Sequence, residues 1–71
     1  MNELNDVAIW DLKVGDMLAE KDGALLQFDG AQLIRGFWRL RLVSEMTGVI
    51  YTRVRKSAKI RRVFRAKTEG K

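Results

Sequence analysis

Residues 37–54, FWRLRLVSEMTGVIYTRV, decide the fold, because they contain two runs with the period-2 alternation of β-strands on either side of a glycine-containing turn. In the first run Leu40 and Leu42 alternate with Arg39 and Arg41, and the second run alternates in the same way. The stretch therefore predicts a β-hairpin with one apolar face toward the core and one arginine-bearing face toward solvent.

The length of the hairpin loop sets which residues face one another. A two-residue loop at Thr47-Gly48 would mix apolar and charged side chains, whereas a three-residue loop, Met46-Thr47-Gly48, sorts them onto separate faces. Gly48 can adopt the left-handed conformation that ends such a loop. We therefore predict the three-residue loop. The predicted pairs are Glu45 with Val49, Leu42 with Thr52, Arg41 with Arg53, Leu40 with Val54, and Arg39 with Arg55.

Opposed arginines repel each other, at a cost of a few tenths to about 1 kcal/mol per pair. Two interpretations of such a face stay open. The face is a surface held ready for an anion, or it is a solvated face whose arginines splay apart or pair with carboxylates elsewhere.

The composition excludes several kinds of site. The chain has 71 residues, enough for one domain with a small core, and contains neither cysteine nor histidine. Disulfides, the commonest zinc ligands and the usual general base are therefore absent. We find no run of transmembrane length and no signal-peptide pattern. We expect a cytoplasmic monomer without a cofactor, with one domain over residues 1–64 and a flexible basic tail over residues 65–71.

Charge is distributed unevenly along the chain. Residues 1–34 contain two basic and seven acidic residues, a net charge of −5, whereas residues 35–71 contain twelve basic and two acidic residues, a net charge of +10. This asymmetry suggests a polyanionic partner for the basic half. The alternative is internal neutralisation, in which the acidic half folds over the basic half.

Turn signals divide the rest of the chain into short strands. Gly15-Asp16 leads into a strand at residues 17–20, Lys21-Asp22-Gly23 leads into another at 24–28, and Asp29-Gly30 turns the chain again. Residues 31–35 continue extended, Gly36 introduces a bend, and residues 60–64 form the last strand.

The N-terminal ten residues leave two alternatives open. Asn2 or Asn5 could cap a short helix, or residues 7–10 could form an edge strand. We expect Trp10 to belong to the core, since a large aromatic side chain is valuable to a small one. The rest of the predicted core comes from the hairpin: Leu40, Leu42, Ile50 and Val54, with Trp38 partly buried and Ile60 inward with Val63 or Phe64.

Short strands with frequent turns predict an all-β fold, and at this length a five-stranded SH3-like barrel, which also protects the edges of its sheet. Three stretches, Leu12-Lys13-Val14-Gly15-Asp16, Lys21-Asp22-Gly23 and Arg39-Leu40-Arg41-Leu42 leading to Thr47-Gly48, resemble the small SH3-like, KOW-like barrels of translation and transcription proteins. The pattern over residues 12–54 is similar to the N-terminal domain of bacterial elongation factor P.

The resemblance implies the fold and an affinity for RNA-rich machinery. It does not imply the elongation factor's activity. That family carries its functional lysine in a hairpin tip before the long strand, and this chain has Leu33-Ile34-Arg35-Gly36 there, without lysine.

An enzymatic function is not expected. The serines and threonines have no histidine to activate them, and Asp11 and Asp16 are interpreted as turn-forming acids. The basic surface remains. Residues 53–67 contain eight basic residues and no acid, and Phe37 and Tyr51 share the arginine face, where they could stack on bases. The candidate binding residues are Phe37, Arg39, Arg41, Tyr51, Arg53, Arg55, Lys56, Lys59, Arg61, Arg62 and Arg65.

Two classes of partner fit this surface. The first is RNA or a ribonucleoprotein. The second is an acidic protein surface on a large machine such as RNA polymerase, as for small virus- or plasmid-encoded regulators of host transcription. Both interactions are electrostatic, so salt dependence alone does not separate them.

Overall fold

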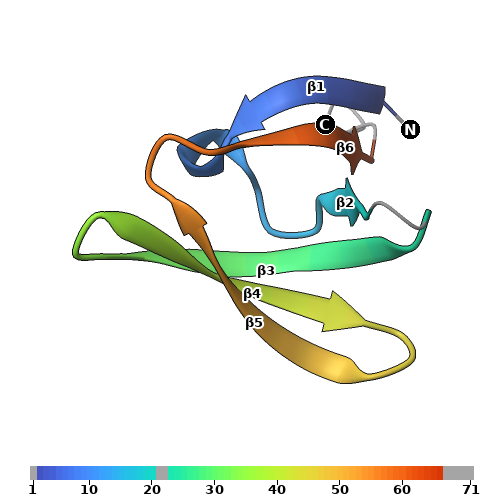
Figure 1. The fold of residues 1–71 in the computed structure, drawn as a ribbon. Helices are drawn as coiled ribbons and strands as arrows, with labels where there is room; N and C mark the ends of the chain where they lie inside the picture. Colours follow the sequence, from blue (N-terminus) through green and yellow to red (C-terminus); the bar gives the residue numbers. More distant parts are fainter. Residues whose placement is uncertain (1, 21–22, 67–71) are drawn as a thin grey trace, which may run out of the picture.

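Strands make up most of the computed structural model, which describes residues 2–20 and 23–66 (Figure 1). Two residues of the hairpin turn predicted at Lys21-Asp22-Gly23, residues 21 and 22, lie outside the described residues, as does the end of the predicted tail, residues 67–71. Gly23 has the expected positive φ, 88°. The described elements are β1 (Asn2–Ala8), the 3-10 turn η1 (Ile9–Asp11), β2 (Met17–Ala19), β3 (Leu25–Ile34), β4 (Phe37–Ser44), β5 (Gly48–Arg55) and β6 (Lys59–Arg65).

All described strands pair antiparallel in one sheet, with the order β1-β6-β2-β3-β4-β5. The sheet curls, so that β1 and β6 lie above the β3-β4-β5 layer (Figure 1). The all-β prediction is confirmed. The predicted five strands are six in the described part of the chain, and β1 and β5 are the two edges of an open sheet there. The added strand is β1, which the sequence left undecided between helix and strand.

The central hairpin forms, but its register differs from the predicted one by two residues. Ser44 pairs with Gly48, so the loop is Glu45-Met46-Thr47. Gly48 has the expected positive φ, 84°, yet it lies in the first position of β5 and not in the loop. The Ser44 hydroxyl accepts hydrogen bonds from the Met46 and Thr47 N–H groups, which closes the loop earlier.

A shift of two residues keeps every side chain on its predicted face, because side chains alternate with period 2. It changes the partners, however. Arg39 faces Arg53, Arg41 faces Tyr51, and Arg55 faces Phe37. One opposed arginine pair therefore replaces the predicted two.

The β3 strand is longer than expected, because Asp29-Gly30 is a bulge within it and not a turn. The chain reverses later, at Arg35-Gly36, where φ is positive at both residues, 44° and 89°. Ile34 pairs with Phe37 across this two-residue turn. Positive φ at both central residues is typical of a type I′ turn, which favours Asn or Gly at its first position. An arginine in the left-handed region costs about 1–2 kcal/mol.

The outermost layer combines the two ends of the chain. Residues 2–8 form an edge strand that pairs with β6, so the helix alternative is wrong there. The edge strand predicted over residues 7–10 is present at residues 7 and 8 only, because Ile9 and Trp10 belong to the 3-10 turn η1. Asp6 has a positive φ of 55°, and the ladder is interrupted there. The inward–outward alternation of side chains consequently shifts by one residue in β1 and in β6. Ile60 and Val63, three positions apart, can therefore both pack toward the core.

The core lies between the two layers. Leu40 and Leu42 are buried as predicted, and Ile50, Val54 and Trp38 are partly buried against them. Trp10 is 63% exposed, so its assignment to the core is wrong. In the turn η1 it is Ile9 that points inward, at 1% exposure. The buried cluster is Ile9, Leu12, Leu18, Leu26, Phe28, Leu40, Leu42 and Val63.

Replacing Leu40 with Ala should destabilise the protein strongly. Leu40 is 1% exposed, and truncating a buried leucine costs about 2–5 kcal/mol, much of the stability of a small domain. Urea unfolding of Leu40→Ala measures this cost. Leu33→Ala is the matched control, since Leu33 is 48% exposed. Equal losses in the two variants would contradict the assignment of the core.

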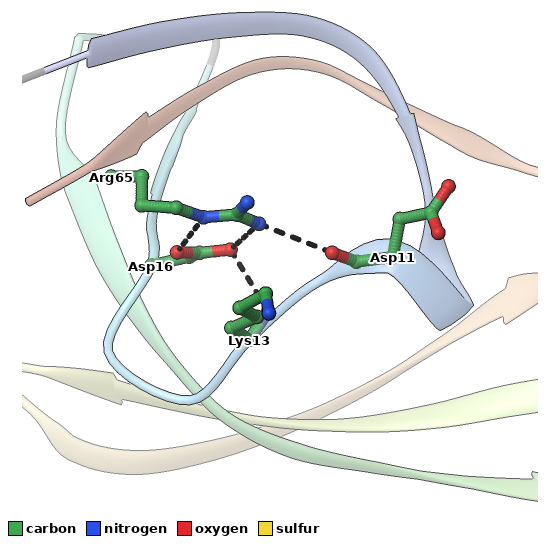
Figure 2. Close-up of polar contacts among 4 residues, drawn as sticks. All are labelled: Asp11, Lys13, Asp16 and Arg65. Carbon is green, nitrogen blue, oxygen red and sulfur yellow. Dashed lines mark hydrogen bonds and ion pairs between the residues drawn. The ribbon is translucent and has the colours of Figure 1, made fainter. Parts of the chain in front are cut away.

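A buried ion pair joins the turn before β2 to the end of β6 (Figure 2). Asp16 is 2% exposed. The Arg65 Nε donates to Asp16 Oδ1 at 2.9 Å and its Nη2 to Oδ2 at 2.7 Å. The same Nη2 donates to the Asp11 carbonyl oxygen at 3.1 Å, and the Lys13 N–H donates to Asp16 Oδ2 at 2.9 Å. Both carboxylate oxygens of Asp16 are thus satisfied.

The ion pair shifts the pKa of both partners toward their charged forms. The hydrogen bonds from Arg65 lower the pKa of Asp16, together with the Lys13 N–H and against the opposing effect of burial. The hydrogen bonds to Asp16 raise the pKa of Arg65. Because the pKa of Asp16 is lower in the folded state than in the unfolded state, ionised Asp16 stabilises the fold above the unfolded value of about 3.9. That stability is lost as pH falls through the folded pKa.

We expect Asp16→Asn to destabilise the protein at pH 7, toward the low end of the roughly 3–5 kcal/mol for a broken buried pair, because Arg65 retains some contact with solvent. The difference from wild type should shrink as pH falls below about 4, since wild-type Asp16 then becomes protonated. Thermal melts across pH measure both effects.

The control for this experiment is Asp11→Asn, because the Asp11 side chain is exposed and only its carbonyl contacts Arg65. Equal melting temperatures for Asp16→Asn and Asp11→Asn at pH 7 would show that the pair contributes nothing to stability.

Candidate nucleic-acid interface

The outer face of the β3-β4-β5 layer carries the predicted arginines in aligned rows. One row contains Gln32, Arg39 and Arg53. The next row toward the Arg35-Gly36 turn contains Ile34, Phe37 and Arg55. We call the outward side chains of β4 and β5 from Phe37 to Arg41 and from Tyr51 to Arg55 the arginine face.

Two of the arginines on this face lie over aromatic rings. The Arg39 guanidinium is 4.3 Å from the centroid of the Tyr51 ring, and the Arg53 guanidinium is 5.1 Å from that of Phe37. Both contacts are diagonal across the β4–β5 ladder. Each contributes about 0.5–1 kcal/mol at an exposed site, comparable with the repulsion between Arg39 and Arg53. The rings therefore hold the guanidiniums in place and offset the like-charge cost.

Arg41 is neutralised. Its Nε lies 3.0 Å from Asp29 Oδ2, and both side chains are partly exposed. The β3 bulge at Asp29 brings the carboxylate beside β4, which sequence reasoning missed when it assigned Asp29-Gly30 to a turn. Of the predicted arginine face, Arg39, Arg53 and Arg55 are left without an ion pair among the described residues.

Two adjacent hollows lie on the arginine face and share Phe37 and Arg53. The first, about 440 Å³, is also lined by Arg39 and Tyr51. The second, about 300 Å³, reaches Gly36 and Arg55. Both are shallow and open to solvent, and both combine guanidinium groups with an aromatic ring. Such a surface can contact phosphates through the guanidiniums and bases through stacking.

The basic residues of β6 lie on the other layer. The inward side chains of β4 and β6 meet in the same core cluster, so the outward side chains of the two strands point to opposite sides of the molecule. Arg62 contacts Glu3 at 3.0 Å and lies over the Phe64 ring at 5.3 Å. Lys59 and Arg61 are exposed on this strand. The basic run is therefore divided between two surfaces over its described part, residues 53–66.

Arg65, predicted as a binding residue at the start of the flexible tail, is the last residue of β6 and is committed to Asp16. Its guanidinium makes three hydrogen bonds within the protein. Asp16 was expected to form a turn, and its carboxylate accepts a hydrogen bond from the Lys13 N–H in that turn. Its pairing with Arg65, 49 positions later in the sequence, has no local sequence signal.

The opposite end of the same layer is apolar. Met46 in the hairpin loop is 92% exposed, and Val49 and Leu25 are also exposed. A hollow of about 450 Å³ is lined in part by Met46, Leu25 and Val43. The outer face therefore changes from basic and aromatic at the Arg35-Gly36 end to apolar at the Glu45-Thr47 end.

Two further findings concern other kinds of site. Over residues 2–20 and 23–66 no group of three or more acidic side chains is placed to hold a metal ion. The single helical turn in these ranges is far too short to cross a membrane.

Comparisons with protein-family models, with curated proteins and with solved structures find no match to this chain.

The contact between Arg39 and Tyr51 should be measurable as a coupling. A double-mutant cycle with Arg39→Ala and Tyr51→Ala, followed by urea unfolding, should give a favourable coupling of about 0.5–1 kcal/mol. The pair of Arg61→Ala with Tyr51→Ala is the control, because Arg61 lies on the other layer, and its coupling should be near zero. A near-zero coupling for Arg39 and Tyr51 as well would contradict the contact.

Proposed function

We propose that this protein is a non-enzymatic binding module that holds single-stranded RNA, free or within a ribonucleoprotein, on its arginine face. The observation that carries the proposal is that two aromatic rings, the exposed Tyr51 and the half-buried Phe37, each pair with an arginine beside adjoining hollows. Single-stranded nucleic acids are bound by this combination of stacking surfaces and positive charge.

The geometry supports stacking in a specific way. When one face of a guanidinium lies on an aromatic ring, its opposite face points outward, where a base can stack. Its N–H groups, at the edge of the plane, remain available for phosphate oxygens. Because Tyr51 and Phe37 hold Arg39 and Arg53 over their rings, less side-chain entropy is lost when a ligand binds. No helix is presented for reading a major groove in the described residues, which favours a single strand over duplex DNA.

A second candidate is an acidic protein surface, such as one on RNA polymerase. The apolar end of the same layer, with Met46, Val49 and Leu25 exposed, favours it, since apolar side chains beside arginines are typical of protein interfaces. Binding that survives nuclease treatment and depends on Met46 would identify this partner.

Kinship with the SH3-like, KOW-like barrels remains part of the proposal. It is supported by the size of the domain, by the β3-β4-β5 meander and by the two packed layers. A closed barrel would require β1 and β5 to approach each other.

The double variant Arg39→Ser/Arg53→Ser should bind a labelled single-stranded oligoribonucleotide at least about ten-fold more weakly than wild type, which corresponds to about 1.4 kcal/mol. Fluorescence anisotropy at several salt concentrations measures the affinity and its slope. The slope of log affinity against log salt should become shallower by up to about 1.4, since each lost phosphate contact on a single strand removes about 0.7.

The matched control is Lys59→Ser/Arg61→Ser, which removes the same charge from exposed positions of β6. It should retain nearly the wild-type affinity. If the two double variants lost affinity equally, binding would reflect net charge alone and the arginine face would not be the site.

A further inference from the structure

The strained turn at Arg35-Gly36 adds an arginine to the basic end of the arginine face. Arg35 is exposed and has φ 44°, in a position that a type I′ turn reserves for Asn or Gly. Asparagine there would relieve the strain and keep the turn. A residue held in an unfavourable conformation at an exposed tip points to a role beyond folding.

The turn lies beside a second connection. The Lys56 N–H donates to the Gly36 carbonyl oxygen at 3.3 Å, so the β3–β4 turn and the β5–β6 turn are joined at one corner of the molecule. Figure 1 shows both connections at the same end of the sheet. Phe37, the first residue after the strained turn, is paired with Arg55 at this corner. Three basic residues from two connections, Arg35, Arg55 and Lys56, therefore gather here, and we call this group the basic corner.

Among the described residues, no carboxylate neutralises the positive charge of the basic corner. All three side chains are exposed, and no ion pair is formed by any of them within the described residues. The hollow of about 300 Å³ on the arginine face opens toward the corner, because Gly36 and Arg55 line it together with Phe37 and Arg53. Elsewhere in the fold Arg41, Arg62 and Arg65 each have a carboxylate partner.

We propose that the basic corner binds a phosphate group of the nucleic acid strand and fixes the strand's position on the arginine face. This inference rests on the proposed function. Guanidinium groups contact phosphate oxygens through two parallel hydrogen bonds, and the ammonium of Lys56 adds a point charge. Among the described residues, those that line the hollow at the opposite, apolar end of the layer include no basic side chain. The phosphate therefore anchors the strand at the corner, and its bases lie toward Phe37 and Tyr51.

The strain at Arg35 makes a distinctive test possible. Arg35→Asn should raise the melting temperature by about 4–8 °C if it recovers the cost of the left-handed arginine in a domain of this size. The same variant should bind the labelled single-stranded oligoribonucleotide about three- to ten-fold more weakly, with a salt slope shallower by about 0.7. Arg61→Asn, an exposed arginine on β6, is the control, and its affinity should stay near that of wild type.

A second measurement separates the corner from the proposed function. Inorganic phosphate, titrated without RNA and followed by backbone amide chemical shifts, should perturb residues 35, 36 and 56 in wild type and not in Arg35→Asn. If phosphate perturbs the corner while no oligoribonucleotide binds, the phosphate site stands and the RNA proposal fails. If Arg39→Ser/Arg53→Ser weakens RNA binding while Arg35→Asn melts higher and binds as tightly as wild type, the proposed function stands and the corner is overturned.

Discussion

The ion pair between Asp16 and Arg65 is a long-range polar constraint that joins the turn before β2 to the end of β6, where the sheet curls. Asp16 connects three parts of the chain. Its backbone carbonyl accepts a hydrogen bond from the Phe28 N–H of β3, and its side chain accepts from Arg65 of β6, which also donates to the carbonyl of Asp11 in η1. The short β2 contributes only three residues to the sheet. Because so few backbone hydrogen bonds join the layers at β2, a buried and fully hydrogen-bonded carboxylate there contributes more than it would within a long ladder.

The charge asymmetry of the sequence is resolved partly within the fold. Three acidic residues of the N-terminal half, Glu3, Asp16 and Asp29, pair with Arg62, Arg65 and Arg41 of the C-terminal half. Internal neutralisation and a free basic surface are thus both present, in different places. Lys59 and Arg61 stay exposed on β6, while Arg35, Arg39, Arg53 and Arg55 leave uncompensated charge at one end of the β3-β4-β5 layer. The two arginine–aromatic contacts lie at that end. A polyanion approaching this end would meet guanidiniums that are already oriented.

The surface that we propose as the binding site contains two arrangements that reduce the stability of the fold. Arg39 and Arg53 face each other, and Arg35 occupies a left-handed position that favours a smaller residue. The aromatic contacts offset the first cost, and no described contact offsets the second. Unfavourable terms of about 1 kcal/mol matter in a domain whose total stability is of the order of 5–15 kcal/mol, and they concentrate at functional sites. The arginine face and the basic corner therefore reduce the stability of the fold locally, while they present guanidinium groups that can bind anions.

The sequence by itself determined the all-β class, the central hairpin and the inward side of Leu40 and Leu42, because alternation with period 2 is a local property of the chain. It also placed Arg39 and Arg53 on one outward face, since a register shift of two residues leaves the faces unchanged. Only the tertiary structure decided the exposure of Trp10, the bulge at Asp29 and the separation of the β6 basic residues from the hairpin. These features depend on which strands pair across the sheet, and the Asp29 bulge lies in the pairing of β3 with β4. The same holds for the Arg65–Asp16 pair, since no local pattern encodes which carboxylate a distant arginine will meet.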